Sequence, residues 1–149
     1  MQAWIVVGGA ENFELLRERE FDICGFKASR RKQSGEMRPG DRLVYYLTKV
    51  VQFGGIVEVT STMFEDTSNF GLRSEGKQGE EYPFRVQTKP VVIPPQGHYV
   101  EVREITDLLE KTRTLGPQRL GLAFQGNLHR ISDADYAQIE RLLQANLDG

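Results

Sequence analysis

The chain has 149 residues, of which 39% are hydrophobic and 27% are charged, and its net charge is −2. These are ordinary values for a chain that closes one hydrophobic core, so we expect a single domain over residues 1–149. The acidic balance excludes a protein that holds nucleic acid through bulk positive charge. Any such contact has to come from a local patch.

The sequence indicates a cytoplasmic protein. Cys24 is the only cysteine, so no disulfide forms within the chain, and a reducing compartment is expected. Residues 1–13 carry no basic region, and their apolar run is too short for a signal peptide. No window approaches the roughly 20 apolar residues of a membrane helix, so we expect no membrane partner.

The N-terminal part predicts a strand, a helix and a second strand. Residues 3–7 are a short apolar run, typical of a buried strand, and two glycines end it. Residues 10–19 have the apolar spacing of a helix, and residues 21–26 form a short possible strand. Residues 27–32 then follow as a basic loop or a single helical turn.

The centre of the chain predicts strands that tight turns connect. Residues 39–41, Pro-Gly-Asp, are a strong turn signal, and residues 43–47 alternate as a strand does. Residues 53–61 form the next strand. The glycine pair inside it, Gly54-Gly55, indicates a bulge or a close backbone approach.

A polar, glycine-rich segment separates these strands from the next one. Residues 65–81 predict a long loop, and loops of this length are often functional. Residues 82–89 then alternate clearly, with Phe84 on the core face and Arg85 on the opposite face. The prolines that follow predict that a strand over residues 91–93 lies at a sheet edge.

Helices are expected near the C-terminus. Residues 105–110 predict a short helix. Ser132 and Asp135 fit a capping box, and apolar residues from Tyr136 to Leu147 then line one helix face. Strands in the middle with helices near both ends favour the α+β class and a small mixed β-barrel with flanking helices.

The residues give no positive evidence for catalysis. The glycines after the first strand lack the third glycine of a dinucleotide-binding turn, so a tight turn is favoured. Cys24 with His98 or His129 would be a nucleophile and a base, but no local motif supports this pairing. These residues also lack metal-ligand spacing. We predict no enzyme, no metal and no cofactor, and keep an enzyme that acts through Cys24 as a remote alternative.

The strongest local signal is the basic run. Residues 27–32 hold four cations in six positions and no acid. A solvated loop is the simplest interpretation. However, the run follows Gly25-Phe26, where the backbone could approach a ligand beside an aromatic ring, and its arginines suit phosphate contacts. Phe70 is the aromatic best placed to act as a lid, and residues 124–127 contain amides that could read a base edge.

In its order of motifs, the chain resembles EVE domains. The resemblance spans residues 3–146, and the motifs are AWIVVGGAENF, GFKASRRK, MRPGDRLVYYL, FGGIVEVTS, FED at 64–66, YPFRV, LAFQGN and ISDADYAQIERLL. EVE domains belong to the PUA-like superfamily, with the PUA, ASCH and YTH domains. The resemblance therefore implies a PUA-like mixed β-barrel with flanking helices.

The resemblance also implies a function. It predicts a non-catalytic reader of a nucleobase, often a modified one, whose partner is DNA or RNA, with a nuclease or modification system as a possible further partner. The residues that would form the site are Cys24, Gly25, Phe26 and Lys27 at the pocket floor, Phe70, Tyr82 and Pro83 at one wall, Gln125 and Asn127 near the opening, and Arg30 and Arg31 at a rim for phosphates.

Three positions depart from the family pattern. Tryptophans are common in relatives at the positions of Cys24, of residues 70–72 and of Leu120-Gly121. A base stacked on an aromatic ring gains about 1–3 kcal/mol, so these losses are expected to weaken or redirect binding. The alternative is a protein-interaction or small-ligand-binding module on the same barrel, without nucleic-acid affinity.

Overall fold

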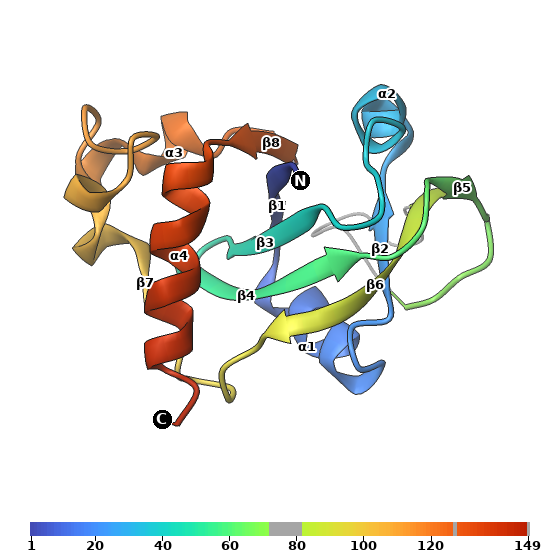
Figure 1. Cartoon of the computed structure of the whole chain (residues 1–149), viewed down its shortest axis with the longest axis horizontal. Coiled ribbons are helices and arrows are strands. Elements are labelled where there is room, and N and C mark those ends of the chain that lie inside the picture. Colours follow the sequence, from blue (N-terminus) through green and yellow to red (C-terminus); the bar gives the residue numbers. More distant parts are fainter. Residues whose placement is uncertain (72–81, 127, 149) are drawn as a thin grey trace.

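The computed structural model describes residues 1–71, 82–126 and 128–148 (Figure 1). Its strands are β1 (Ala3–Gly8), β2 (Ile23–Phe26), β3 (Arg42–Leu47), β4 (Gln52–Val59), β5 (Phe64–Glu65), β6 (Phe84–Val92), β7 (Val100–Glu101) and β8 (Leu128–Ile131). Its helices are α1 (Ala10–Glu18), α2 (Arg31–Ser34), α3 (Leu120–Ala123) and α4 (Asp133–Ala145), with the 3₁₀ turns η1 (Ala28–Arg30), η2 (Val102–Glu104), η3 (Thr106–Leu108) and η4 (Pro117–Arg119).

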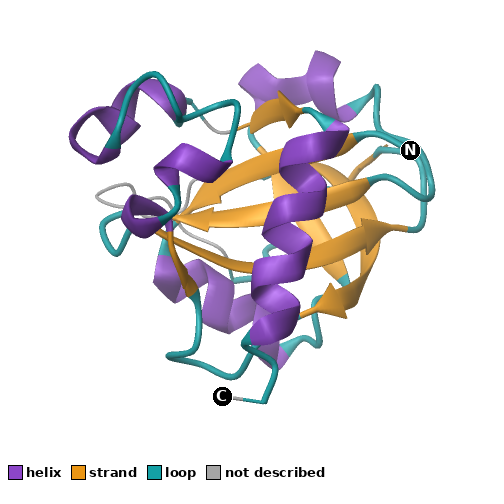
Figure 2. Ribbon diagram, turned by 60° about the vertical axis from the view of Figure 1, so that its left-hand side comes forward, coloured by secondary structure: helices purple, strands orange, loops and turns teal. Residues whose placement is uncertain are grey.

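The strands form one mixed sheet in the order β2-β6-β4-β3-β1-β8, with β5 added beside β6 and β7 beside β4. β1 and β3 run parallel, and the other pairs are antiparallel. The sheet curls into an open half-barrel, and α4 crosses one face of it (Figure 2). This confirms the predicted α+β class with flanking helices.

Both faces of the central strands are buried. On β3, Val44 and Tyr46 join a core that α4 covers, whereas Leu43 and Tyr45 join a second core that contains residues of α1 and β2. The alternation predicted for β3 is therefore correct, but neither set of side chains faces solvent. Burial on both faces explains why this strand is apolar almost throughout.

The glycine pair in β4 fulfils both predicted roles. Gly54 has no partner in the β3–β4 register, because Tyr45 pairs with Gly55 and Tyr46 pairs with Phe53. A Cβ atom on Gly54 would also lie 3.0 Å from the ring of Phe13. The bulge thus lets α1 pack directly on the strand backbone.

Two sequence predictions are only partly correct. Residues 91–93 do not form a separate strand, because β6 continues through Pro90, which pairs with Val57 beside a register shift in β4, but the predicted position at a sheet edge is correct. β2 pairs with β6 only as far as Gln87, so the described chain places no strand beside the missing N–H of Pro90. Residues 105–110 form no α-helix; the segment contains η3 instead.

The start of α4 is partly as predicted. The Ser132 hydroxyl accepts a hydrogen bond from the Asp135 N–H at 3.1 Å and caps the helix. The Asp135 carboxylate does not complete the capping box; it accepts from the backbone N–H groups of Glu110 at 2.7 Å and Lys111 at 3.0 Å. The buried face ends at Leu143, and Leu147 is exposed beyond the helix end.

Among the described residues, no helix combines the length and apolarity that a membrane span requires.

Candidate functional site

A bare patch of backbone on β2 lies beside a buried arginine on β6. Gly25 pairs directly with Arg85, and Arg85 pairs on its other side with Phe64 of β5. Directly opposed residues share a face of a sheet. Cys24 and Phe26, the neighbours of Gly25, point into the α1-side core. Gly25 and Arg85 therefore face away from that core.

Two aromatic residues cover the backbone of Gly25. A Cβ atom at this position would lie 2.7 Å from Cζ of Phe70 and 2.8 Å from Cβ of Tyr82, so only glycine allows this approach. The segment before Phe70 is tied to β6, because the Asp66 N–H donates to the Pro83 carbonyl at 2.8 Å. Phe70 and Tyr82 thus lie beside Gly25, and Pro83 follows Tyr82 in the chain.

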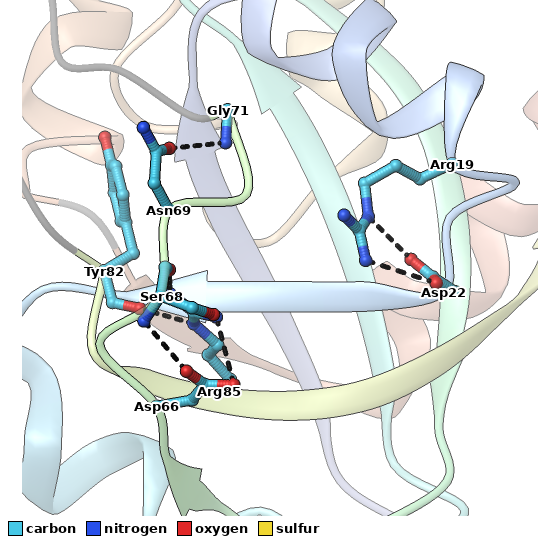
Figure 3. A network of polar contacts seen from close by, with 8 residues as sticks. All are labelled: Arg19, Asp22, Asp66, Ser68, Asn69, Gly71, Tyr82 and Arg85. Carbon is cyan, nitrogen blue, oxygen red and sulfur yellow. Dashed lines mark hydrogen bonds and ion pairs between the residues drawn. The ribbon is translucent and has the colours of Figure 1, made fainter.

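Arg85 is almost fully buried, with 3% of its surface exposed, and hydrogen bonds hold its guanidinium in place. Its guanidinium donates to the Tyr82 carbonyl at 2.9 Å and to the hydroxyl and carbonyl of Ser68, and it lies 3.5 Å from Asp66 Oδ2 (Figure 3). Its Cζ lies 4.2 Å from the centroid of the Phe70 ring. Hydrogen bonds to Ser68, with a smaller contribution from Arg85, hold the pKa of Asp66 below its ordinary value. We call Gly25, Phe70, Tyr82 and Arg85 the Gly25–Arg85 cluster.

Sequence reasoning missed Arg85. Alternation placed it on the outer face of its strand, which is correct, and such positions are normally solvated. The segment over residues 66–70 folds back and covers it, with Asp66 and Ser68 as its partners. Only the acid in the FED motif at 64–66 was a signal for this arrangement, and nothing in the local pattern pairs that acid with Arg85.

The basic run lies against the loop that follows α3. Gly126 has φ +82°, and a Cβ atom on it would lie 2.8 Å from Nη2 of Arg30. Arg30 Nε is buried and makes no hydrogen bond within the described residues. Gly126 therefore lies against the basic run, and Gln125, the residue before it, is exposed. Asn127 lies outside the described residues.

Lys111 and His129 lie near Arg30. Burial lowers the pKa of His129, and the charges of Lys111 and Arg30 lower it further, against a hydrogen bond to the backbone of Gln125. Arg31 takes a different position, with its Cζ 5.6 Å from the centroid of the Phe84 ring. We call Arg30, Lys111 and His129 the Arg30–His129 cluster. The predicted rim arginines therefore have different surroundings.

Cys24 is a core residue in this fold. It is 2% exposed, and burial raises the pKa of its thiol to about 12, although the Tyr45 hydroxyl beside it acts in the opposite direction. A thiol of this kind is protonated at neutral pH and is a poor nucleophile. Cys24 and Phe26 thus shape the strand under Gly25 from the core side. Within the described ranges, no three His, Cys, Asp or Glu residues are grouped as metal ligands would be.

Comparison with known proteins extends the sequence resemblance. Residues 2–142 match the EVE domain family. The UPF0310 protein PH1033 of Pyrococcus horikoshii is 28% identical over an alignment of 156 positions. The alignment covers 96% of this chain and 99% of the relative. The UPF0310 protein PYRAB08750 of Pyrococcus abyssi is 24% identical, with 96% and 100% covered.

Solved structures share the fold. The YTH domain of Zygosaccharomyces rouxii MRB1, solved in complex with N6-methyladenosine RNA, superposes with a TM-score of 0.65 at 15% identity, covering 96% of this chain and 86% of that one. A hypothetical protein from Leishmania major gives 0.63 at 16% identity, covering 97% and 96%. These likenesses show that the chain shares the fold of a YTH domain. The sequence match, which runs over nearly the whole chain, shows that this protein belongs to the EVE domain family.

Proposed function

We propose that this protein binds a nucleobase of DNA or RNA, without catalysis, at the Gly25–Arg85 cluster. The observation that carries this proposal is the buried guanidinium of Arg85 beside Gly25, a strand position without a side chain against which the ring of Phe70 packs. A guanidinium whose donors are already satisfied presents a flat face, and such faces stack on planar rings. Because Gly25 has no side chain, a ring can lie at that face, as the ring of Phe70 does.

The fold supports this choice of ligand. The related YTH domain of Zygosaccharomyces rouxii was solved with RNA that carries N6-methyladenosine. By analogy, the base that binds here is a modified one, splayed out of its strand and held by stacking and by hydrogen bonds to its edge. Gln125, which is exposed and precedes Gly126, is the described amide that would read this edge.

Arg30 and Lys111, the charged members of the Arg30–His129 cluster, would hold the phosphates of the same strand. Lys27 follows Gly25 by two residues, so the basic run begins next to the proposed base site. Arg30 lies against Gly126, and its buried Nε has no hydrogen-bond acceptor in the described chain. Because Arg30 as a whole is only half-buried, a phosphate oxygen would accept from the accessible part of its guanidinium.

A binding titration tests the proposal. End-labelled single-stranded and duplex oligonucleotides, unmodified or carrying 5-methylcytosine, 5-hydroxymethylcytosine or N6-methyladenine, are titrated at two salt concentrations. The label is the readout because Trp4, the one tryptophan of the chain, is only 1% exposed. Modification-dependent, salt-sensitive binding is expected. Flat curves with every oligonucleotide would contradict the proposal, and binding of free nucleosides alone would favour the small-ligand module.

A further inference from the structure

The ring of Phe70 makes the contacts that a bound ring would make. Its tip is directed at the backbone of Gly25, and its face lies 4.2 Å from the guanidinium carbon of Arg85. A second guanidinium, that of Arg19, lies 5.7 Å from the same ring centroid and is tied to Asp22 (Figure 3). A half-buried phenyl ring therefore occupies a space that two arginines and a glycine surround.

This space is framed by contacts that do not involve Phe70. Arg85 is held by Tyr82, Ser68 and Asp66, and the Ser68 N–H donates to Asp66 Oδ1 at 2.8 Å. The segment is thus anchored as far as Ser68, two residues before the ring. Removal of the ring from the guanidinium would break none of these hydrogen bonds, so the space would keep its shape.

We propose that the space filled by the Phe70 ring, between Gly25, Arg19 and Arg85, is the ligand-binding site, and we call this space the seat. A planar heteroaromatic ring binds there by displacing Phe70 and stacking on Arg85. The inference rests on the proposed function and deepens it, because it assigns Arg85 as the stacking residue and takes Phe70 out of the pocket wall. An occupant that must leave lowers the apparent affinity by the fraction of molecules in which the seat is filled. Phe70 therefore competes with the ligand.

The two roles of Phe70 predict opposite signs for one substitution. If Phe70 is an occupant, Phe70→Ala empties the seat and strengthens binding, by about 3- to 30-fold for a displaced cation–π contact. If Phe70 is a wall that stacks on the base, the same variant binds more weakly. The measurement is the dissociation constant for the oligonucleotide and nucleoside that bind the wild type best. Leu122→Ala, at a residue 55% exposed on α3, is the control and should leave affinity unchanged.

The role of Arg85 needs its own variant. Arg85→Lys keeps the charge but loses the flat face, so it should weaken binding about tenfold, in the wild type and in the Phe70→Ala background alike. Circular dichroism and thermal unfolding of each variant establish that it is folded. Unchanged affinity in a folded Arg85→Lys protein would overturn the assignment of this residue.

A measurement on the unmutated protein settles the case if a variant does not fold. In NMR spectra, the Phe70 ring protons should show a contact to the Gly25 Hα protons that disappears when ligand saturates the protein. Persistence of that contact in the complex would overturn the inference.

The outcomes also separate this inference from the proposed function. If the wild type binds a base and Phe70→Ala binds it more weakly, the proposed function stands and the inference fails. If neither the wild type nor the Phe70→Ala variant binds any base, both fail.

Discussion

Gly25 is the residue whose chemistry is most constrained in the candidate site. A side chain there would collide with Phe70 and with the Cβ atom of Tyr82. The Cβ atom is fixed to the backbone and cannot move aside by a rotation of the side chain. The sequence already identified Gly25-Phe26 as a place of close approach. It did not reveal what approaches, because Phe70 and Tyr82 are distant in the chain, and only the three-strand register places Arg85 opposite Gly25.

Gly25→Ala should therefore destabilise the protein by about 1–3 kcal/mol, since an added methyl group forces its neighbours to shift. It should also abolish base binding, because the methyl group fills the seat. Urea unfolding and the oligonucleotide titration measure these effects. Gly121→Ala is the matched control: it lies in α3 with open space around its Cβ, so alanine should be neutral or slightly stabilising. Equal stability of the two variants would contradict the close approach.

At the scale of elements, the periodicity of apolar residues predicted those helices and strands whose structure depends on neighbouring residues in the chain. The first strand, α1 and α4 follow directly from apolar spacing and end signals. The mistakes lie where a partner from elsewhere in the chain decides the structure. β6 runs on through Pro90 because its register with β4 tolerates the proline. At the start of α4, Ser132 caps the helix as predicted, whereas the Asp135 carboxylate binds the distant backbone of residues 110–111.

Asp135 gives this element-scale argument a test. Its carboxylate is buried and accepts the backbone N–H groups of Glu110 and Lys111, so Asp135→Ala leaves two donors without acceptors. We expect a loss of about 1–3 kcal/mol in the free energy of unfolding. Asp133→Ala is the matched control. Asp133 is an exposed acid in the same first turn, so its substitution removes the same charge without removing a buried acceptor. A similar loss in both variants would mean that the helix dipole, not the tie to residues 110–111, is the cause.

At the scale of the whole molecule, an acidic chain carries a basic run beside its candidate base site. With a net charge of −2, attraction to phosphates depends on a few placed cations. The sequence located the run and the family, whereas its neighbours Lys111 and His129 are brought to Arg30 only by the fold. Arg31, adjacent in sequence, instead covers the ring of Phe84.

The salt dependence of binding tests whether this arrangement holds phosphates. Each phosphate contact adds about 0.7 to the slope of log K against log salt for a single strand, so Arg30→Ala with Arg31→Ala should lower the slope by about 1.4 if both act and by about 0.7 if only Arg30 does. The stacking of Arg31 on Phe84 favours the smaller change. Arg103→Ala with Arg141→Ala removes the same charge from two exposed positions and should leave the slope unchanged. Equal slopes in both double variants would mean that net charge, not a placed contact, governs the attraction.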